Sequence, residues 1–424
     1  MKKPDIFAFD SIYIPKINEV RLDNGVLLRI SPYESSEICR FQIIMRGGTL
    51  DFENPMIYRI TALSMFRGTE NMSADYVASQ FDYYGVNIEK RVATHHTIFD
   101  FTVLKRFIPH VLPIISESIA KPVFEENYFE ILKRNQAQAI SQIYERPQSL
   151  ALIKFKELAY SAMCRIGKSA TPNDSMEVMF DEITGAHHTM INNGIAIIAS
   201  GDISEEIIQI INHTFGTSTF SSIKTHIADS VDNNMPNPGV TTIINRDNAV
   251  QSSIVMGMQM PRRTEEDFID TRIACCLLGG FFGSRLMQAI REEDGLTYGI
   301  SSHISSIDGT SRMMITTDCN IGYTTEVKES IIREIEKKRN VTPDTNEVNI
   351  LKSYLLSQYA RMIDKSMAVG EYLTSQISMG IDNDFFNRQV HRTKEITPNE
   401  ILEISQKYFI PENILSVIVT NKNS

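Results

Sequence analysis

Hydrophobic residues in the first half of the chain follow the periods of strands and helices in turn. Apolar, β-branched runs predict strands at Gly25–Ile30, Phe41–Arg46, Asn87–Thr94, Ile98–Leu104 and Ile195–Ser200. Apolar residues three to four positions apart predict helices at Met56–Phe66, Ala74–Tyr84 and Glu125–Tyr144. The helix at Ala74–Tyr84 is the most sharply bounded, because Ser73 can cap its start and Gly85 can end it.

The order of these elements predicts the fold class. Strands and helices do not alternate regularly, and links such as Val92–Ile98 are as short as those of hairpins. We therefore expect an α+β fold in which helices cover one face of an antiparallel sheet.

The chain contains an internal repeat. A helix, an asparagine turn and a β-branched strand end the first half at Asn193–Ala199, and the same order ends the second half at Asn413–Val419, 220 positions later. Glu182-Ile183-Thr184 and Glu395-Ile396-Thr397 open these two stretches, 213 positions apart. In the middle of each half, a helix ends at a glycine and a strand follows, at Phe81–Asn87 and at Arg291–Thr297.

A polar segment between the two copies contains Pro236 and Pro238 and is typical of a linker. A chain of 424 residues is also too long for one ordinary domain. We expect two homologous domains, residues 1–216 and 239–424, joined by a linker over residues 217–238.

The composition of the chain disfavours several classes of partner and location. The chain is 42% hydrophobic and 22% charged, and its net charge of −10 disfavours nucleic acid and anionic membranes as partners. No run approaches the roughly 18 apolar residues of a membrane span, and no apolar segment of a secretory signal follows the first residues. The cysteines lack metal-ligand spacing and are typical of reduced thiols, so we expect a cytoplasmic protein.

Several motifs, taken in order, resemble those of a known family. They are Arg21-Leu22-Asp23-Asn24-Gly25, Phe66-Arg67-Gly68-Thr69, Gly201-Asp202, Leu278–Leu286 and Arg291-Glu292-Glu293-Asp294-Gly295-Leu296-Thr297-Tyr298. Together they resemble the pitrilysin/insulinase metallopeptidases, in particular the bacterial and mitochondrial-processing-peptidase branch. The resemblance covers nearly the whole chain and implies a LuxS/MPP-like metallohydrolase fold in each domain.

The family's zinc motif, H-x-x-E-H, is degenerate in this chain. Counted back from Phe66, the resemblance puts the first histidine at Arg59, the general base at Ala62 and the second histidine at Leu63. The third ligand, a glutamate about 77 positions after the second histidine, falls on Ile140. A guanidinium repels zinc, and the other three side chains offer no ligand atom. We therefore expect no metal or other cofactor in this chain.

The remaining histidines do not suggest a second metal site. In His95-His96, neighbours on a strand point to opposite faces, and in His187-His188, neighbours on a helix diverge by about 100°.

Arg291 and Tyr298 are the candidate functional residues. The resemblance implies a two-part enzyme in which one chain carries zinc and the other contributes this Arg/Tyr pair. Both side chains donate hydrogen bonds at neutral pH, so together they can hold a peptide carbonyl and stabilise the oxyanion formed on attack. The alternative is structural: Arg291 would pair with the acids that follow it, and Tyr298 would pack as a strand aromatic.

These observations predict a subunit that acts with a partner. As the resemblance implies, we expect the partner to be a zinc-binding peptidase subunit that holds the zinc. The two kinds of chain would form a heterodimer or heterotetramer that cleaves peptides. Two alternatives remain: an inert scaffold of the same fold, and a glycine-rich recognition subunit. The compact Leu278–Arg285 segment argues against the second, and we interpret Arg285 as structural. Phe281 and Phe282 in the same segment are interpreted as part of a packing turn.

Overall fold

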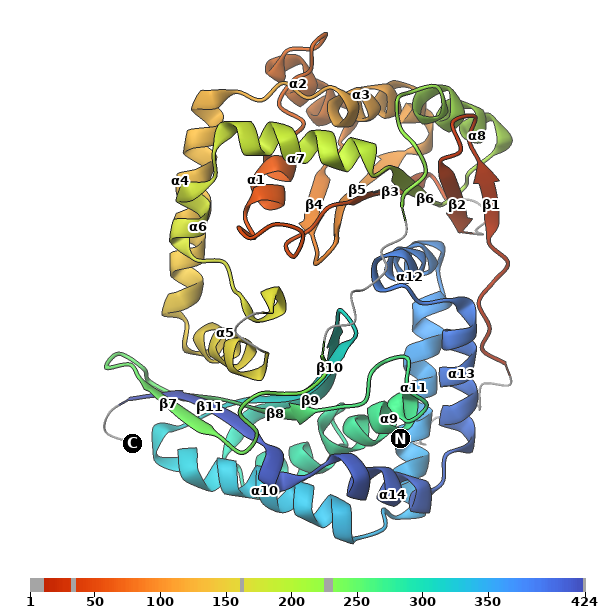
Figure 1. The fold of residues 1–424 in the computed structure, drawn as a ribbon. Helices are drawn as coiled ribbons and strands as arrows, with labels where there is room; N and C mark the ends of the chain where they lie inside the picture. Colours follow the sequence, from red (N-terminus) through yellow and green to blue (C-terminus); the bar gives the residue numbers. More distant parts are fainter. Residues whose placement is uncertain (1–10, 32–35, 161–163, 225–231, 422–424) are drawn as a thin grey trace.

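Two mixed β-sheets organise the chain, each in its own α+β domain (Figure 1). The computed structural model describes residues 11–31, 36–160, 164–224 and 232–421. The first sheet has the order β1-β2-β6-β3-β5-β4. Its strands are β1 (Asn18–Arg21), β2 (Leu27–Ser31), β3 (Ile38–Arg46), β4 (Ile88–Val92), β5 (His96–Leu104) and β6 (Ile195–Ser200).

The second sheet repeats the first without β1. Its order is β7-β11-β8-β10-β9. Its strands are β7 (Thr241–Asn245), β8 (Ser252–Gln259), β9 (Thr297–Ile307), β10 (Thr310–Cys319) and β11 (Leu415–Thr420). Gly85 before β4 and Gly295 before β9 both have φ of 67°. The shared order and the shared glycine conformation are those of a duplicated domain.

The α+β class with two domains is confirmed, but each sheet differs from the expected antiparallel arrangement in one strand pair. β2 pairs with β6 in parallel, and β7 pairs with β11 in parallel, while the other pairs are antiparallel. In both domains the last strand returns from a helix and lies between strands from the start of the copy. Hairpin links could not reveal this pairing, because it joins the two ends of each domain.

Helices form an outer layer on each sheet (Figure 1). Above the first sheet lie α1 (Ile57–Ser64), α2 (Ala74–Tyr84), α3 (Ile108–Ala120), α7 (Phe180–Asn192) and α8 (Glu205–Ile211). Below the second lie α9 (Phe268–Gly279), α10 (Thr324–Asn340) and α14 (Pro398–Tyr408). Ser73 caps α2 and Gly85 ends it, as predicted. Thr184, by contrast, lies within α7 whereas Thr397, 213 positions later, caps α14, so the 213-residue landmark does not mark equivalent positions.

The inner face of each sheet is covered by a helix from the other domain. α4 (Glu126–Glu145) leads to α5 (Pro147–Ala159), which packs on β8 and β11 of the second sheet. α11 (Thr345–Ile363) leads to α12 (Ser366–Met379), which packs on β2, β3 and β6 of the first sheet. Helices therefore cover both faces of each sheet, not one as expected. The other α-helices of the described residues are α6 (Pro172–Glu177) and α13 (Asn383–Glu395).

The α5 contact is tightly packed. Phe155 of α5 is 1% exposed and lies in a cluster with Val255, Leu415 and Val417. Gly257 makes room for it: a Cβ there would lie 2.6 Å from Phe155 Cζ and 2.1 Å from the Met313 carbonyl oxygen. A residue without a side chain is thus required where the first domain's helix meets the second domain's sheet.

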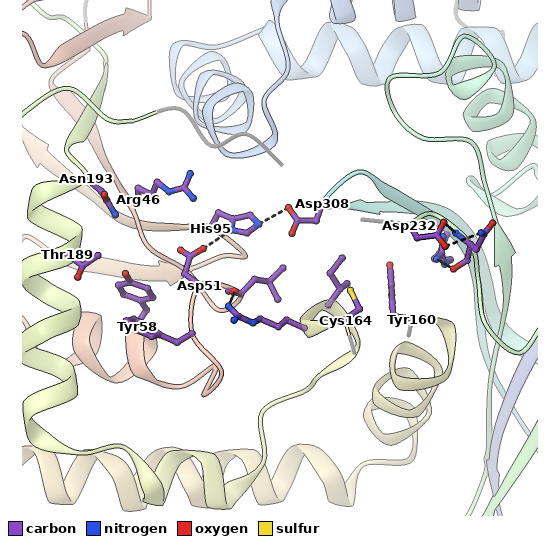
Figure 2. Close-up of a pocket in the computed structure, with 16 residues that line it drawn as sticks. Arg46, Asp51, Tyr58, His95, Tyr160, Cys164, Thr189, Asn193, Asp232 and Asp308 are labelled. Carbon is purple, nitrogen blue, oxygen red and sulfur yellow. Dashed lines mark hydrogen bonds and ion pairs between the residues drawn. The ribbon is translucent and has the colours of Figure 1, made fainter. Parts of the chain in front are cut away.

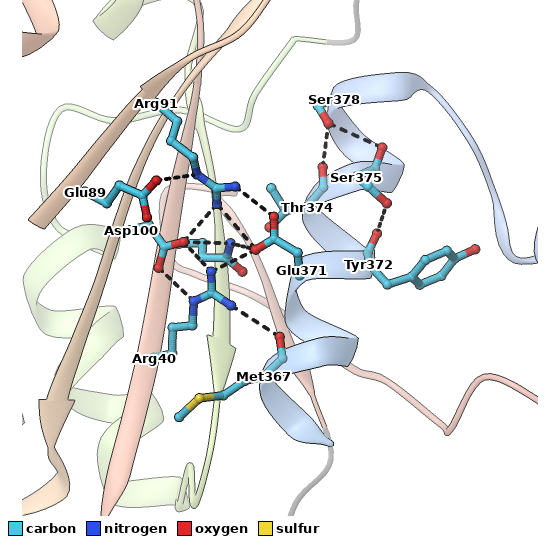
Figure 3. Close-up of polar contacts among 11 residues, drawn as sticks. Arg40, Glu89, Arg91, Asp100, Met367, Glu371, Tyr372, Thr374, Ser375 and Ser378 are labelled. Carbon is cyan, nitrogen blue, oxygen red and sulfur yellow. Dashed lines mark hydrogen bonds and ion pairs between the residues drawn. The ribbon is translucent and has the colours of Figure 1, made fainter. Parts of the chain in front are cut away.

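The α12 contact adds an ion network to apolar packing (Figure 3). Val369 and Leu373 pack on the first sheet, and Glu371 of α12 pairs with Arg40 and Arg91, each at 2.8 Å. Both arginines also pair with Asp100. The network therefore ties one helix of the second domain to three strands of the first.

The described part of the predicted linker is docked on the protein. Asn233 donates a hydrogen bond to the Met260 carbonyl and accepts one from the Ser311 amide, both at 2.9 Å. Arg312, 1% exposed, donates to Asn233 as well. Ile12, numbered with the first domain, lies in the second domain's core. Packing units therefore do not follow the chain boundaries strictly, and the boundaries at 216 and 239 stay a prediction.

Candidate functional site

The degenerate zinc positions come together between α1 and α4. Arg59 on α1 donates from Nε to Gln136 Oε1 on α4 at 2.8 Å, one helical turn before Ile140. Ala62 is fully buried and Ile140 is 7% exposed, and both belong to the core of the first domain. Leu63 packs against the same core. The helix pair that the resemblance assigns to zinc is thus preserved, with an apolar contact between its helices.

The end of α1 is fixed by a buried lysine. Lys90 of the edge strand β4 donates to the carbonyls of Leu63 and Met65 at 3.2 and 2.9 Å, and its Nζ lies 5.2 Å from the centre of the Phe66 ring. Burial lowers the pKa of Lys90 to about 8. Phe66 takes a positive φ of 66° and turns the chain toward Gly68. The Phe66–Thr69 anchor used for counting is therefore a real break after the helix.

The residues at these positions do not fit zinc. Arg59 carries a fixed positive charge, and Ala62, Leu63 and Ile140 have no donor atoms. Elsewhere, within the described ranges, no group of three or more His, Cys, Asp or Glu side chains is arranged to hold a metal ion. No chemical step of this chain can accordingly be assigned to a metal at α1 and α4.

The Arg/Tyr motif spans a π-helix, a turn and an edge strand. Arg291 lies in η4 (Met287–Glu293), which packs against β9, and Tyr298 is the second residue of β9. Gly295 ends the π-helix in the left-handed conformation, and the Leu296 amide donates to the Ile290 carbonyl at 2.9 Å. π-helical turns often occur at functional sites. The two residues are therefore held on neighbouring elements with a fixed turn between them.

Both side chains reach solvent. Tyr298 is 91% exposed, and no described residue forms a hydrogen bond with its hydroxyl. Arg291 pairs with Glu292 at 3.4 Å and lies over the Phe282 ring at 5.2 Å from its centre. The structural alternative is thus observed for Arg291 as a solvent-exposed pair of little energetic weight. For Tyr298 the packing alternative is wrong, since its ring is not buried.

The turn before the motif separates its two phenylalanines. Phe281 stacks on Tyr354 with ring centres 5.0 Å apart, as expected of a packing turn. Phe282 is 63% exposed and faces Arg291, which the sequence interpretation missed. Arg285 donates to both oxygens of Glu347 at 2.6 and 2.9 Å, in agreement with its structural interpretation.

A cavity of about 890 Å³ lies where the two domains meet (Figure 2). His95, between β4 and β5, bridges two carboxylates in it: Nδ1 lies 2.9 Å from Asp51 and Nε2 lies 2.7 Å from Asp308 of the second domain. Burial alone would lower the pKa of His95, but the hydrogen bonds to Asp308 and Asp51 raise it to about 9. Two N–H donors require an imidazolium, so His95 is a charged clamp between the domains.

Comparison with known proteins places these features in a family. Residues 180–355 match the Peptidase M16 inactive domain, and residues 62–167 match Insulinase (Peptidase family M16). The chain belongs to the M16 peptidase family. The first match contains Arg291 and Tyr298, and the second contains Ala62, Leu63 and Ile140.

Individual M16 relatives are distant. An uncharacterized zinc protease of Rickettsia bellii (strain RML369-C) is 26% identical over 306 residues, which span 68% of this chain and 70% of the relative. Mitochondrial-processing peptidase subunit alpha-1 of Dictyostelium discoideum is 20% identical over 229 residues, 52% of this chain and 34% of the relative. The crystal structure of a peptidase M16 inactive domain from Pseudomonas fluorescens has a TM-score of 0.84 and 15% identity, and covers 96% of this chain and 98% of that one.

None of the described helices of this M16 chain combines the length and the apolar character needed to cross a membrane.

Proposed function

We propose that this chain is the subunit of a heteromeric M16 peptidase that binds no zinc and supplies Arg291 and Tyr298 to the active site of a partner. The partner would carry the H-x-x-E-H motif and its zinc, and would hydrolyse the peptide. The match of residues 180–355 to the inactive domain and the likeness to a processing-peptidase subunit support this proposal. Cytoplasmic localisation stays a prediction.

One observation carries the proposal: Tyr298 is 91% exposed directly after a turn formed by Gly295 and by the hydrogen bond from Leu296 to Ile290. Folding gains nothing from an aromatic ring in water, so the phenol is available to a ligand. Arg291, on the adjoining π-helix, has only a weak exposed pair to give up. A phenol and a guanidinium presented to the same partner active site can donate hydrogen bonds to one peptide carbonyl.

The test is hydrolysis of an unstructured peptide by this chain mixed with its H-x-x-E-H partner. Arg291→Ala and Tyr298→Phe should each lower kcat about 100-fold or more, the usual cost of removing an oxyanion donor. Arg388→Ala and Tyr83→Phe are matched controls, because Arg388 is exposed and lies over a phenylalanine ring as Arg291 does, and Tyr83 is 76% exposed. Unchanged turnover in both motif variants would favour the inert scaffold instead.

A further inference from the structure

A pocket of about 440 Å³ adjoins the Arg/Tyr motif on the inner face of the second sheet. Gly299, Ile300 and Ser301, which directly follow Tyr298 on β9, form one wall. Met287, one helical turn before Arg291, forms another. Both motif residues thus lie on elements that border the same pocket.

The surface of the pocket is mainly apolar, and its lining carries one charged side chain. Leu152 and Met287 contribute accessible apolar side chains, and Asp318 is the one ionisable residue of the lining among the described residues. The neutral polar residues of the lining are Gln148, Ser253, Ser301, Thr316 and Thr317. Leu152 belongs to α5, so the first domain completes a pocket built on the second domain's sheet. An aliphatic chain fits such walls, and a carboxylate requires a cation or several donors.

Asp318 is held by neutral donors only. Ser253 Oγ donates to its Oδ1 at 2.6 Å, and Gln148 Nε2 donates to its Oδ2 at 3.3 Å. No described cationic side chain lies within ion-pair distance of this carboxylate. The neighbouring hollow is lined by Glu145 and Arg146, one charge of each sign, and so adds no net positive charge. The pocket therefore combines aliphatic walls with an oriented, unneutralised carboxylate.

We propose that this pocket binds a lysine or arginine side chain of the peptide substrate, near the carbonyl held by Arg291 and Tyr298. The aliphatic stem lies along Leu152 and Met287, and the cationic head pairs with Asp318. The role of this pocket in peptide cleavage rests on the proposed function. The pocket itself belongs to this chain alone, so binding can be measured without the partner.

The test compares two labelled, unstructured peptides that differ at one position, arginine against its neutral isostere citrulline. Their binding to the full-length chain is measured by fluorescence anisotropy. The arginine peptide should bind about two- to fivefold more tightly, as for a partly exposed ion pair, and the difference should shrink in high salt. Asp318→Asn should make the two peptides equal, whereas Asp364→Asn, at an exposed position outside the pocket, should preserve the preference.

A second variant guards against misfolding of the first. Leu152→Lys puts a resident cation at the pocket's edge, where Leu152 is 39% exposed, and should abolish the preference while Asp318 is retained. The proposal would be overturned if the wild type bound the arginine and citrulline peptides equally, or if it bound the arginine peptide undetectably. That result would leave the turnover test of Arg291 and Tyr298 untouched. A preference that persists while those variants keep full turnover would instead refute the catalytic role and retain the pocket.

Discussion

The His95 clamp gives a stability that depends on pH in a predictable direction. Replacing His95 with glutamine keeps a hydrogen-bonding side chain but removes the charge between Asp51 and Asp308. The pKa of His95 is raised from 6.5 to about 9 on folding, so the clamp contributes its full stability below pH 6.5. That contribution is lost as pH rises through 9, where the folded imidazolium loses its proton.

The change in the pKa of His95 determines how much stability the clamp contributes. A rise of the pKa from 6.5 to about 9 corresponds to about 3 kcal/mol, because each pKa unit is worth about 1.4 kcal/mol. The His95 side chain is only 9% exposed and that of Asp308 only 11%, so solvent screening is small. We expect His95→Gln to lower the free energy of unfolding by about 3 kcal/mol at pH 6.5 and by less than about 1 kcal/mol at pH 10.

Other groups require that the variant be compared with the wild type at each pH. Burial lowers the pKa of Lys90 to about 8 and that of Lys338 to about 7, so both favour the folded state more as pH rises. Burial raises the pKa of Tyr58, which lines the same cavity, to about 12, and its phenol stays neutral throughout. These contributions cancel in the difference between wild type and variant.

Urea unfolding followed by far-UV circular dichroism is the suitable assay, because the chain has no tryptophan. Asp308→Asn removes the carboxylate of the second domain and should reproduce most of the pH dependence of the His95 variant. A difference between wild type and His95→Gln that stays constant from pH 6.5 to 10 would refute the reasoning, because the imidazole would then titrate alike in both states.

The remaining predictions concern the contacts between the domains. Glu371→Gln should destabilise the protein by about 1 kcal/mol, and by less in high salt, because the Glu371 side chain is 45% exposed. Urea unfolding at two salt concentrations measures this effect. A loss of stability that salt leaves unchanged would contradict the prediction. Gly257→Ala should cost about 3 kcal/mol, because its Cβ would overlap Phe155 and the Met313 carbonyl. Gly299→Ala, whose Cβ meets nothing within 4 Å, is the control, and equal melting temperatures for the two variants would refute the packing argument.

Local signals in the sequence were sufficient to predict single helices and strands. Ser73 and Gly85 bound α2 at the predicted residues, because capping depends on neighbours a few positions away. The five strands predicted in the first half all occur, with small changes at their ends. The degenerate zinc positions come from the family resemblance and not from a local signal; the structure places them on helices in contact, since Arg59 on α1 donates to Gln136 on α4.

Contacts between distant residues could not be predicted in the same way. His95 and Asp308 are 213 positions apart, and nothing in either local pattern indicates the other. Apolar residues on α5 and α12 indicate a buried face but not which sheet covers it. Phe282 was interpreted with Phe281 as part of one turn, because exposure depends on the direction of each side chain.

The exchange of α5 and α12 also constrains how the protein is made. The first sheet has all its strands once residue 200 is synthesised, yet the helix that covers its inner face spans residues 366–379. Until that helix emerges from the ribosome, Ile44, Ile98 and Ile198 face water. A nascent chain stopped at the end of the first domain would therefore expose an aggregation-prone surface, and the duplicated halves have become one folding unit.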